Sequence, residues 1–267
     1  MVLIVFNCFG QDDLLKQKDY ADSIFKAQNY FDAIKEYKRL MFFDKQDNFS
    51  FYAYNQIAKC YKYGGKFEKA SEYFSLALLK ARNDKEIFHT KVNLCRLNII
   101  QRKTSNAKRM LDQIENEGRF SIYEDEIKYW RAWIYFFEWK WVEASKIFEE
   151  LGKKNLYEIC ISNKDKFYSI EKAKILSMFL PGLGQFYTGN YLSGFGSFLW
   201  NTLSAYLTIS AFYQDRIFDG VIISNLLWLR FYKGNLENAE KFALEKNNIL
   251  FEETLDFIYK NYSEEIP

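Results

Sequence analysis

The stretch from residue 54 to residue 77, YNQIAKCYKYGGKFEKASEYFSLA, has two apolar patterns with helical spacing, one on each side of a glycine pair. Apolar side chains three and four positions apart form one face of an amphipathic helix. Gly64 and Gly65 favour a tight turn between the two patterns. The stretch therefore predicts a helix, a short turn and a second helix.

The second helix of this pair recurs along the chain. Four alanines lie 37 residues apart, and each is followed four positions later by a large apolar side chain. The alanines are Ala33, Ala70, Ala107 and Ala144, and the large side chains are Tyr37, Phe74, Leu111 and Phe148. A helix pair of this kind cannot bury its apolar face alone, so we expect four copies to stack on one another.

The composition supports an all-α fold and excludes some functions. Two prolines among 267 residues are too few for a fold with many turns, and they fit long helices. The 37 Lys and Arg residues nearly balance the 35 Asp and Glu residues and are interleaved with them, so we expect no basic stripe for nucleic acid. The four cysteines and the single histidine, His89, lack the spacing of a metal site, and we expect no cofactor and no enzymatic activity.

The second copy resembles the tetratricopeptide repeat. The matching residues are Tyr54, Ile57, Ala58, Tyr61, Gly65, Phe67, Ala70, Phe74 and Ala77, and Gln28 and Trp139 replace the glycine in the first and fourth copies. The resemblance covers residues 12–152 and implies a helical solenoid that binds a peptide or protein partner. Lys62, Lys66 and Lys69 are candidate partner-binding residues that would clamp a carboxylate; the alternative is a solvated helix edge.

A tract without charged residues runs from Ile175 to Gln214. Within it, residues 191–213 are long enough to cross a hydrocarbon layer about 30 Å thick. After the tract, residues 217–232 form a second, shorter apolar stretch. The tract predicts a transmembrane helical hairpin in a module over residues 175–233. We expect Asn201 and Asn225 to bond across this hairpin. The alternative is a hairpin buried in a soluble repeat adaptor.

The tract contains the sequence LPGLGQFYTGN at residues 180–190. It lacks the third glycine of a dinucleotide-binding loop and the Gly-Lys-Ser/Thr of a Walker loop. We instead expect Pro181 to end a helix that begins near Ile170, Gly182 and Gly184 to adopt positive φ angles, and Gly189 to form the turn into the next helix.

These residues also resemble a small two-helix membrane module that follows tetratricopeptide repeats in uncharacterised Bacteroidetes-type cell-envelope proteins. The motif residues are Pro181, Gly182, Gly184, Gln185, Tyr187 and Gly189, and residues 231–240, FYKGNLENAE, match the end of the module. The resemblance implies an architecture more than an activity, together with a guess that such proteins assist membrane-protein insertion or envelope assembly.

Residues 1–10, MVLIVFNCFG, resemble the end of a secretory signal peptide; the alternative is an N-terminal strand. With a signal peptide, the repeats would be periplasmic and the module would lie in the bacterial inner membrane, although the lysines before the tract favour the opposite orientation. We also expect a linker helix over residues 153–174 and an amphipathic helical tail over residues 234–267.

Together these patterns predict a membrane-anchored, non-enzymatic scaffold that binds a protein and, at the hairpin, a second membrane protein. Two alternatives remain open. One is the soluble repeat adaptor. The other is an oligomeric membrane transporter or enzyme that uses Asp219 and Gln185.

Overall fold

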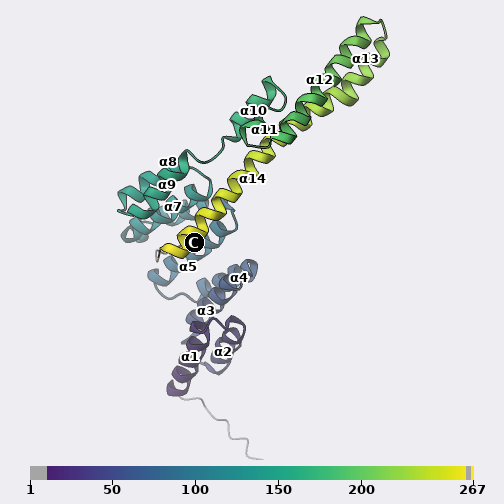
Figure 1. Ribbon diagram of the computed structural model, residues 1–267. Helices are drawn as coiled ribbons and strands as arrows, with labels where there is room; N and C mark the ends of the chain where they lie inside the picture. Colours follow the sequence, from purple (N-terminus) through teal and green to yellow (C-terminus); the bar gives the residue numbers. More distant parts are fainter. Residues whose placement is uncertain (1–10, 263–265) are drawn as a thin grey trace, which may run out of the picture. The chain divides into compact units, whose positions relative to one another are not determined.

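The computed structural model describes residues 11–262 and 266–267, which contain helices and no strand (Figure 1). The prediction of an all-α fold is confirmed. The predicted signal peptide, at residues 1–10, lies outside the described residues. The helices divide into two compact units, one that extends to Cys160 and one that begins at Ile161.

The first unit is a series of helix pairs. From α1 to α8, each helix packs against the next one in the chain. The series comprises α1 (Gln11–Lys26), α2 (Tyr30–Phe43), α3 (Ser50–Tyr63), α4 (Phe67–Lys80), α5 (Asp84–Ile100), α6 (Thr104–Glu115), the 3-10 helix η1 (Gly118–Tyr123), α7 (Glu124–Phe137) and α8 (Trp141–Glu150), after which α9 (Lys154–Lys164) begins.

The repeat is visible in the backbone of the turns. Gln28, Gly65, Arg102 and Trp139 lie 37 residues apart, and all four have φ between 57° and 70°. At each turn the amide of the following residue donates a hydrogen bond to the carbonyl oxygen five residues back, as from Lys66 N to Tyr61 O at 2.8 Å. This is the Schellman arrangement that ends many helices, and it normally takes glycine at the left-handed position.

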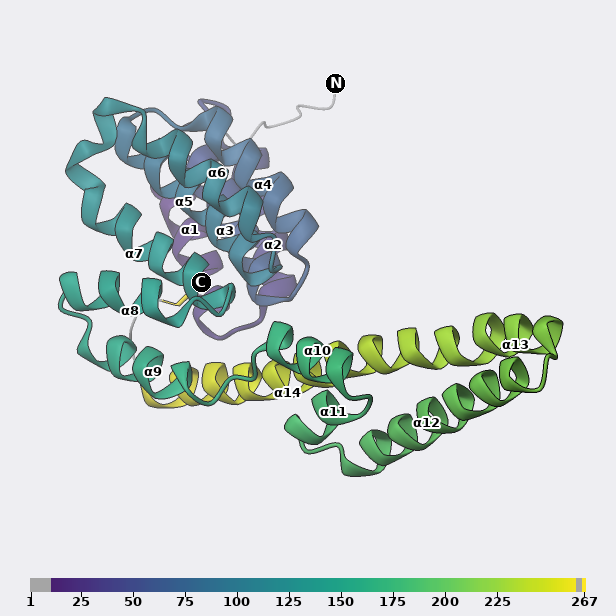
Figure 2. The ribbon, with the colours of Figure 1, turned by 90° about the horizontal axis from the view of Figure 1, so that it is seen from above.

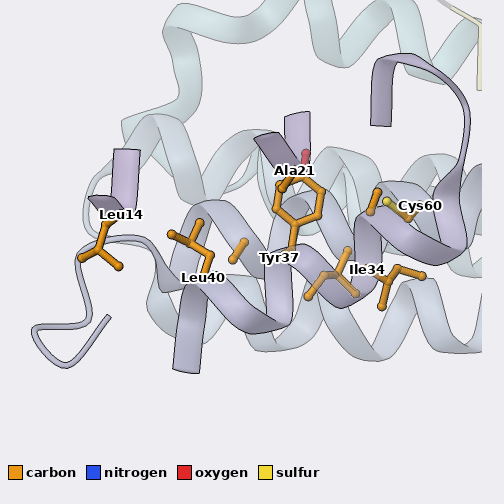
Figure 3. Close-up of a cluster of buried hydrophobic side chains, with 9 residues drawn as sticks. Leu14, Ala21, Ile34, Tyr37, Leu40 and Cys60 are labelled. Carbon is orange, nitrogen blue, oxygen red and sulfur yellow. The ribbon is translucent and has the colours of Figure 1, made fainter. Parts of the chain in front are cut away.

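The predicted inner faces form the core of this unit. Ala33, Ala70, Ala107 and Ala144 are fully buried, as are the large side chains four positions after each of them. In the first copy, Ile34, Tyr37 and Leu40 of α2 pack with Leu14 and Ala21 of α1 and with Cys60 of α3 (Figure 3). The small alanines let neighbouring helices approach closely within this series of helix pairs.

The second unit is built around a long helical hairpin. It contains α10 (Ile170–Phe179), α11 (Leu183–Tyr187), α12 (Tyr191–Tyr213), α13 (Ile217–Ile223), the π-helical turn η2 (Ser224–Trp228) and α14 (Leu229–Asn261). Figure 2 shows α12 alongside α13 and the beginning of α14, and α10 packs against α14. The segment 153–174 holds two helices rather than one linker helix, and the helix of the tail already begins at Leu229.

The hydropathy of these helices does not support the predicted transmembrane hairpin. No helix in the described part of the chain is both long enough and apolar enough to cross a membrane. Residues 191–213 do form one helix with the predicted bounds, but Asn201, Ser204 and Thr208 lower its hydropathy. The second stretch is divided into α13, η2 and the start of α14.

Candidate functional site

The glycine motif forms the connection from α10 to α12. The helix expected to begin near Ile170 is α10, and it ends just before Leu180 and Pro181. Gly182 has φ 98°, as predicted, and Gly189, with φ 76°, lies in the predicted turn before α12. A Cβ atom at Gly182 would overlap the carbonyl oxygen of Gly194, so this position needs glycine for space as well as for conformation.

The prediction of a positive φ at Gly184 is wrong, because this residue lies within the short helix α11. Glycine is required at this position because no space is left for a side chain. A Cβ atom there would overlap the carbonyl oxygen of Ala173 in α10 and would lie 2.7 Å from the Cβ of Ala239 in α14. Gly184 therefore allows α11 to pack closely against two other helices.

A buried hydrogen-bond network, here called the polar clasp, joins Ser177, Gln185 and Asn235. Gln185 Nε2 donates to the backbone oxygen of Asn235 at 3.0 Å and to its Oδ1 at 3.1 Å, and Ser177 Oγ donates to Gln185 Oε1 at 3.0 Å. Asn235 Nδ2 donates to Ser177 O at 2.9 Å, and the amides of Gly182 and Gly184 donate to Asn235 Oδ1 and Ser177 Oγ. All three side chains are at most 1% exposed.

The clasp explains why the two sequence motifs occur together. Gln185 comes from the first motif and Asn235 from the second, 50 residues later. The side-chain oxygen and nitrogen of Gln185 both make hydrogen bonds. This suits a structural role, since burying a polar group destabilises the fold little once its hydrogen bonds are made. A glutamine within an uncharged tract was the sequence signal, but its partner could not be identified from spacing.

Tyr187 anchors the start of α10. Its hydroxyl accepts a hydrogen bond from Ser169 N at 3.2 Å, and its ring meets that of Tyr168 edge to face with centroids 5.3 Å apart. Asn247 of α14 holds the same segment, because its side chain donates to and accepts from the backbone of Tyr168 at 2.8 Å in each case. Tyr187 is thus a packing residue between α10 and α11.

The hairpin has an inverted distribution of side chains. Its buried positions on α12 are all small or polar: Gly194, Asn201, Ser204, Thr208 and Ala211. Its exposed positions carry large apolar side chains. Those at least 50% exposed are Tyr191, Leu192, Phe195, Leu199, Trp200, Tyr206, Ile209, Tyr213, Ile217, Phe218 and Leu226. A helical hairpin in water normally has the opposite pattern.

The two asparagines of the hairpin behave differently. Asn201 Nδ2 donates to Ser197 O at 2.8 Å in its own helix and to Phe231 O at 3.4 Å across the hairpin, so the predicted cross-hairpin bond is found there. The prediction for Asn225 is wrong. Its side chain is exposed and donates to Val221 O at 2.9 Å, one turn earlier in the same helical segment.

The three candidate lysines of the repeats lie around the turn between α3 and α4. Lys66 and Lys69 are exposed, and Lys62 is half-buried. The Lys69 ammonium lies 5.6 Å from the centre of the Tyr61 ring. Lys66 and Lys69 are thus two exposed cations near one turn, the kind of group that pairs with a carboxylate.

Asp219 and Gln185, the residues that a transporter or enzyme would use, lie in different surroundings. Asp219 is exposed near the hairpin turn and pairs with Arg216 at 3.6 Å, whereas Gln185 is enclosed in the clasp. Within residues 11–262 and 266–267, no group of His, Cys, Asp and Glu side chains could hold a metal ion. Burial raises the pKa of the Cys60, Cys95 and Cys160 thiols to about 12, so these thiols are not activated as nucleophiles.

No protein-family model, curated protein or solved structure matches the chain. The sequence and the geometry of this chain are therefore the basis for its function.

Proposed function

We propose that the chain is a non-enzymatic protein-interaction scaffold whose hairpin, from α12 to the start of α14, is embedded in a bacterial cell membrane. The observation that carries the proposal is the outward apolar surface of this hairpin. Many of its large apolar side chains are exposed, whereas the buried positions of α12 are all small or polar.

This arrangement is costly in water and favourable in lipid. Soluble monomers rarely expose a continuous apolar patch of more than a few hundred Å², because each Å² costs about 25 cal/mol. In lipid the outer face meets acyl chains, and Asn201, Ser204 and Thr208 are hidden between the helices. Three of the polar side chains that lower the hydropathy of α12 would therefore not contact lipid.

The length and the ends of the hairpin fit the same proposal. The 23 residues of α12 span about 34 Å, close to the thickness of a hydrocarbon layer of about 30 Å. Charged side chains occur at the turn, in Asp215, Arg216 and Asp219, and at the opposite end, in Arg230 and Lys233. Tyr191 and Tyr213 lie exposed at the two ends of α12, as interfacial aromatics do.

For the first unit we propose a tetratricopeptide-like solenoid that binds a protein partner. Stacked helix pairs present a long continuous surface and carry no chemistry of their own. Lys66 and Lys69 would meet an acidic segment or a terminal carboxylate of the partner. From the signal-peptide prediction we place this unit on the periplasmic side of the inner membrane, with a role in membrane-protein insertion or envelope assembly.

Flotation of the full chain with phospholipid vesicles, followed by an alkaline carbonate wash, tests the membrane anchor. We expect the chain to float and to resist the wash. The variant Leu199→Glu/Ile209→Glu, which charges the outer face of α12, should be released almost completely. The control Leu79→Glu/Ile122→Glu changes two apolar side chains of the first unit that are even more exposed than Leu199 and Ile209, and it should remain bound. Release of the unaltered chain would contradict the anchor and favour the soluble adaptor.

A further inference from the structure

A polar cavity of about 860 Å³ opens between the first half of α12 and the start of α14. It lies at the end of the hairpin that carries the clasp, since Asn235 lines it as well. Its walls include Ser193, Ser197, Trp200, Arg230, Lys233 and Glu237. Neither the clasp nor the outer apolar face accounts for this cavity.

The cavity carries an excess of positive charge. Arg230 and Lys233 are both exposed and lie three positions apart on one face of α14. Neither makes an ion pair with any residue that the structure describes. Glu237 is the one carboxylate among the lining residues, one turn beyond Lys233. Two cations without an ion-pair partner suit a phosphate, and the planar guanidinium of Arg230 can donate to two of its oxygens at once.

Asn201 adds an unmet hydrogen-bond acceptor. It lines the cavity and is 3% exposed, and its Oδ1 accepts no hydrogen bond within the described part of the chain. An unpaired buried acceptor is destabilising. A ligand N–H or O–H group that reached this buried oxygen would satisfy it, and the exposed carboxylate of Glu237 offers an accessible acceptor for such groups.

One side of the cavity is apolar. The rings of Trp200 and Phe231 stack with centroids 5.4 Å apart and planes at 18°, and Leu229 lies on the same wall. Trp200 and Leu229 also belong to the exposed apolar surface of the hairpin. A ligand in this cavity would thus have its polar part between Arg230 and Lys233 and an apolar part along the hairpin.

We propose that the cavity binds the headgroup of one phospholipid, with its phosphate between Arg230 and Lys233 and its hydrogen-bond donors toward Asn201 and Glu237. The inference rests on the proposed insertion of the hairpin in lipid. Ethanolamine and glycerol headgroups share the required chemistry, a phosphodiester with N–H or O–H donors. Choline lacks these donors. The acyl chains follow the outer face of α12.

Native mass spectrometry of the full chain, released from lipid nanodiscs of phosphatidylethanolamine, phosphatidylglycerol and phosphatidylcholine, tests the site. We expect one retained phospholipid per chain, with phosphatidylcholine retained least. Arg230→Gln/Lys233→Gln should lower the retained fraction by about tenfold or more, as loss of charge-assisted bonds implies. Lys241→Gln/Lys246→Gln, on the same helix but outside the cavity, is the matched control and should retain lipid normally.

Vesicle flotation of the same samples separates the two proposals. If the unaltered chain floats but its retained lipid is unaffected by Arg230→Gln/Lys233→Gln, the headgroup site is wrong and the membrane anchor stands. If the chain does not float, the anchor itself is wrong. Displacement of the lipid by millimolar inorganic phosphate would show that the cavity takes free phosphate and would overturn the assignment to a phospholipid.

Discussion

Gly184 and Gly196 are helical glycines of the same unit, but their surroundings differ. A Cβ atom at Gly184 would overlap backbone of α10, whereas at Gly196 it would meet no atom within 4 Å. We expect Gly184→Ala to destabilise the chain by about 2–4 kcal/mol, because α10, α11 and α14 must separate. Gly196→Ala should be neutral or stabilising by up to about 1 kcal/mol.

Thermal unfolding of the full chain in detergent measures this difference. A change of 1 kcal/mol shifts the midpoint by about 2–4 °C in a protein of this size. Equal midpoints for the two alanine variants would show that the close packing around Gly184 is absent.

Asp22 connects three helices of the first unit. Its carboxylate accepts hydrogen bonds from the hydroxyls of Tyr37 at 2.7 Å and Tyr52 at 2.6 Å, and from the Lys18 ammonium at 2.9 Å. Burial raises the pKa of Asp22, but the hydrogen bonds from Tyr52, Tyr37 and Lys18 outweigh it, so the net pKa lies below its ordinary value. The ionised carboxylate is therefore stabilised by folding.

This contribution should be present above pH 3.8, the ordinary pKa of an aspartate, and should be lost as the pH falls through the lower pKa of the folded state. We expect Asp22→Asn to cost about 1–3 kcal/mol at pH 7 and clearly less at pH 2. Amide hydrogen exchange in α1 and α2 at the two pH values measures both costs. An equal cost at both would contradict a role for the charge.

The turns between paired helices impose the same backbone conformation on different residues. Gln28 is exposed and has φ 61°, and Gly65 has φ 70° with open space around it. Because only glycine adopts this region without strain, we expect Gln28→Gly to stabilise the chain by about 0.5–1 kcal/mol and Gly65→Ala to destabilise it by about 1 kcal/mol.

Midpoints of thermal unfolding should move in opposite directions for these two variants. If Gln28→Gly lowered the midpoint, the entropy gained by the unfolded chain would outweigh the relief of strain, and the four turns would not be equivalent.

Sequence reasoning succeeded for elements whose partners are near in the chain. The alanine spacing predicted the inner faces because each helix pair is local, and Pro181 with Gly182 predicted the end of α10 because both act on their own backbone. The clasp was missed because its hydrogen bonds join residues 50 positions apart. Asn225 was mispredicted because its side chain bonds within its own helical segment instead of across the hairpin.

For the molecule as a whole, the two units divide the proposed work. The first provides a repeated helical surface with exposed cations at the turn between α3 and α4. The second provides an outward apolar hairpin, and the clasp ties the α14 arm of this hairpin to α10 and α11. Mean hydropathy of a helix averages over its inner and outer faces. In the structure, large apolar side chains of α12 are exposed and its buried positions are small or polar, and this difference between the two faces supports the proposed anchor.

Spin-label accessibility along α12 tests that anchor most directly. Nitroxides attached to single cysteines at Leu199, Tyr206 and Ile209, and at the inward positions Ser204 and Thr208, would be measured in vesicles, with the native cysteines replaced by alanine. We predict that the outward labels are accessible to oxygen dissolved in lipid and shielded from a water-soluble nickel complex, and that the inward labels are shielded from both. Outward labels that collide mainly with the nickel complex would contradict a membrane-embedded hairpin.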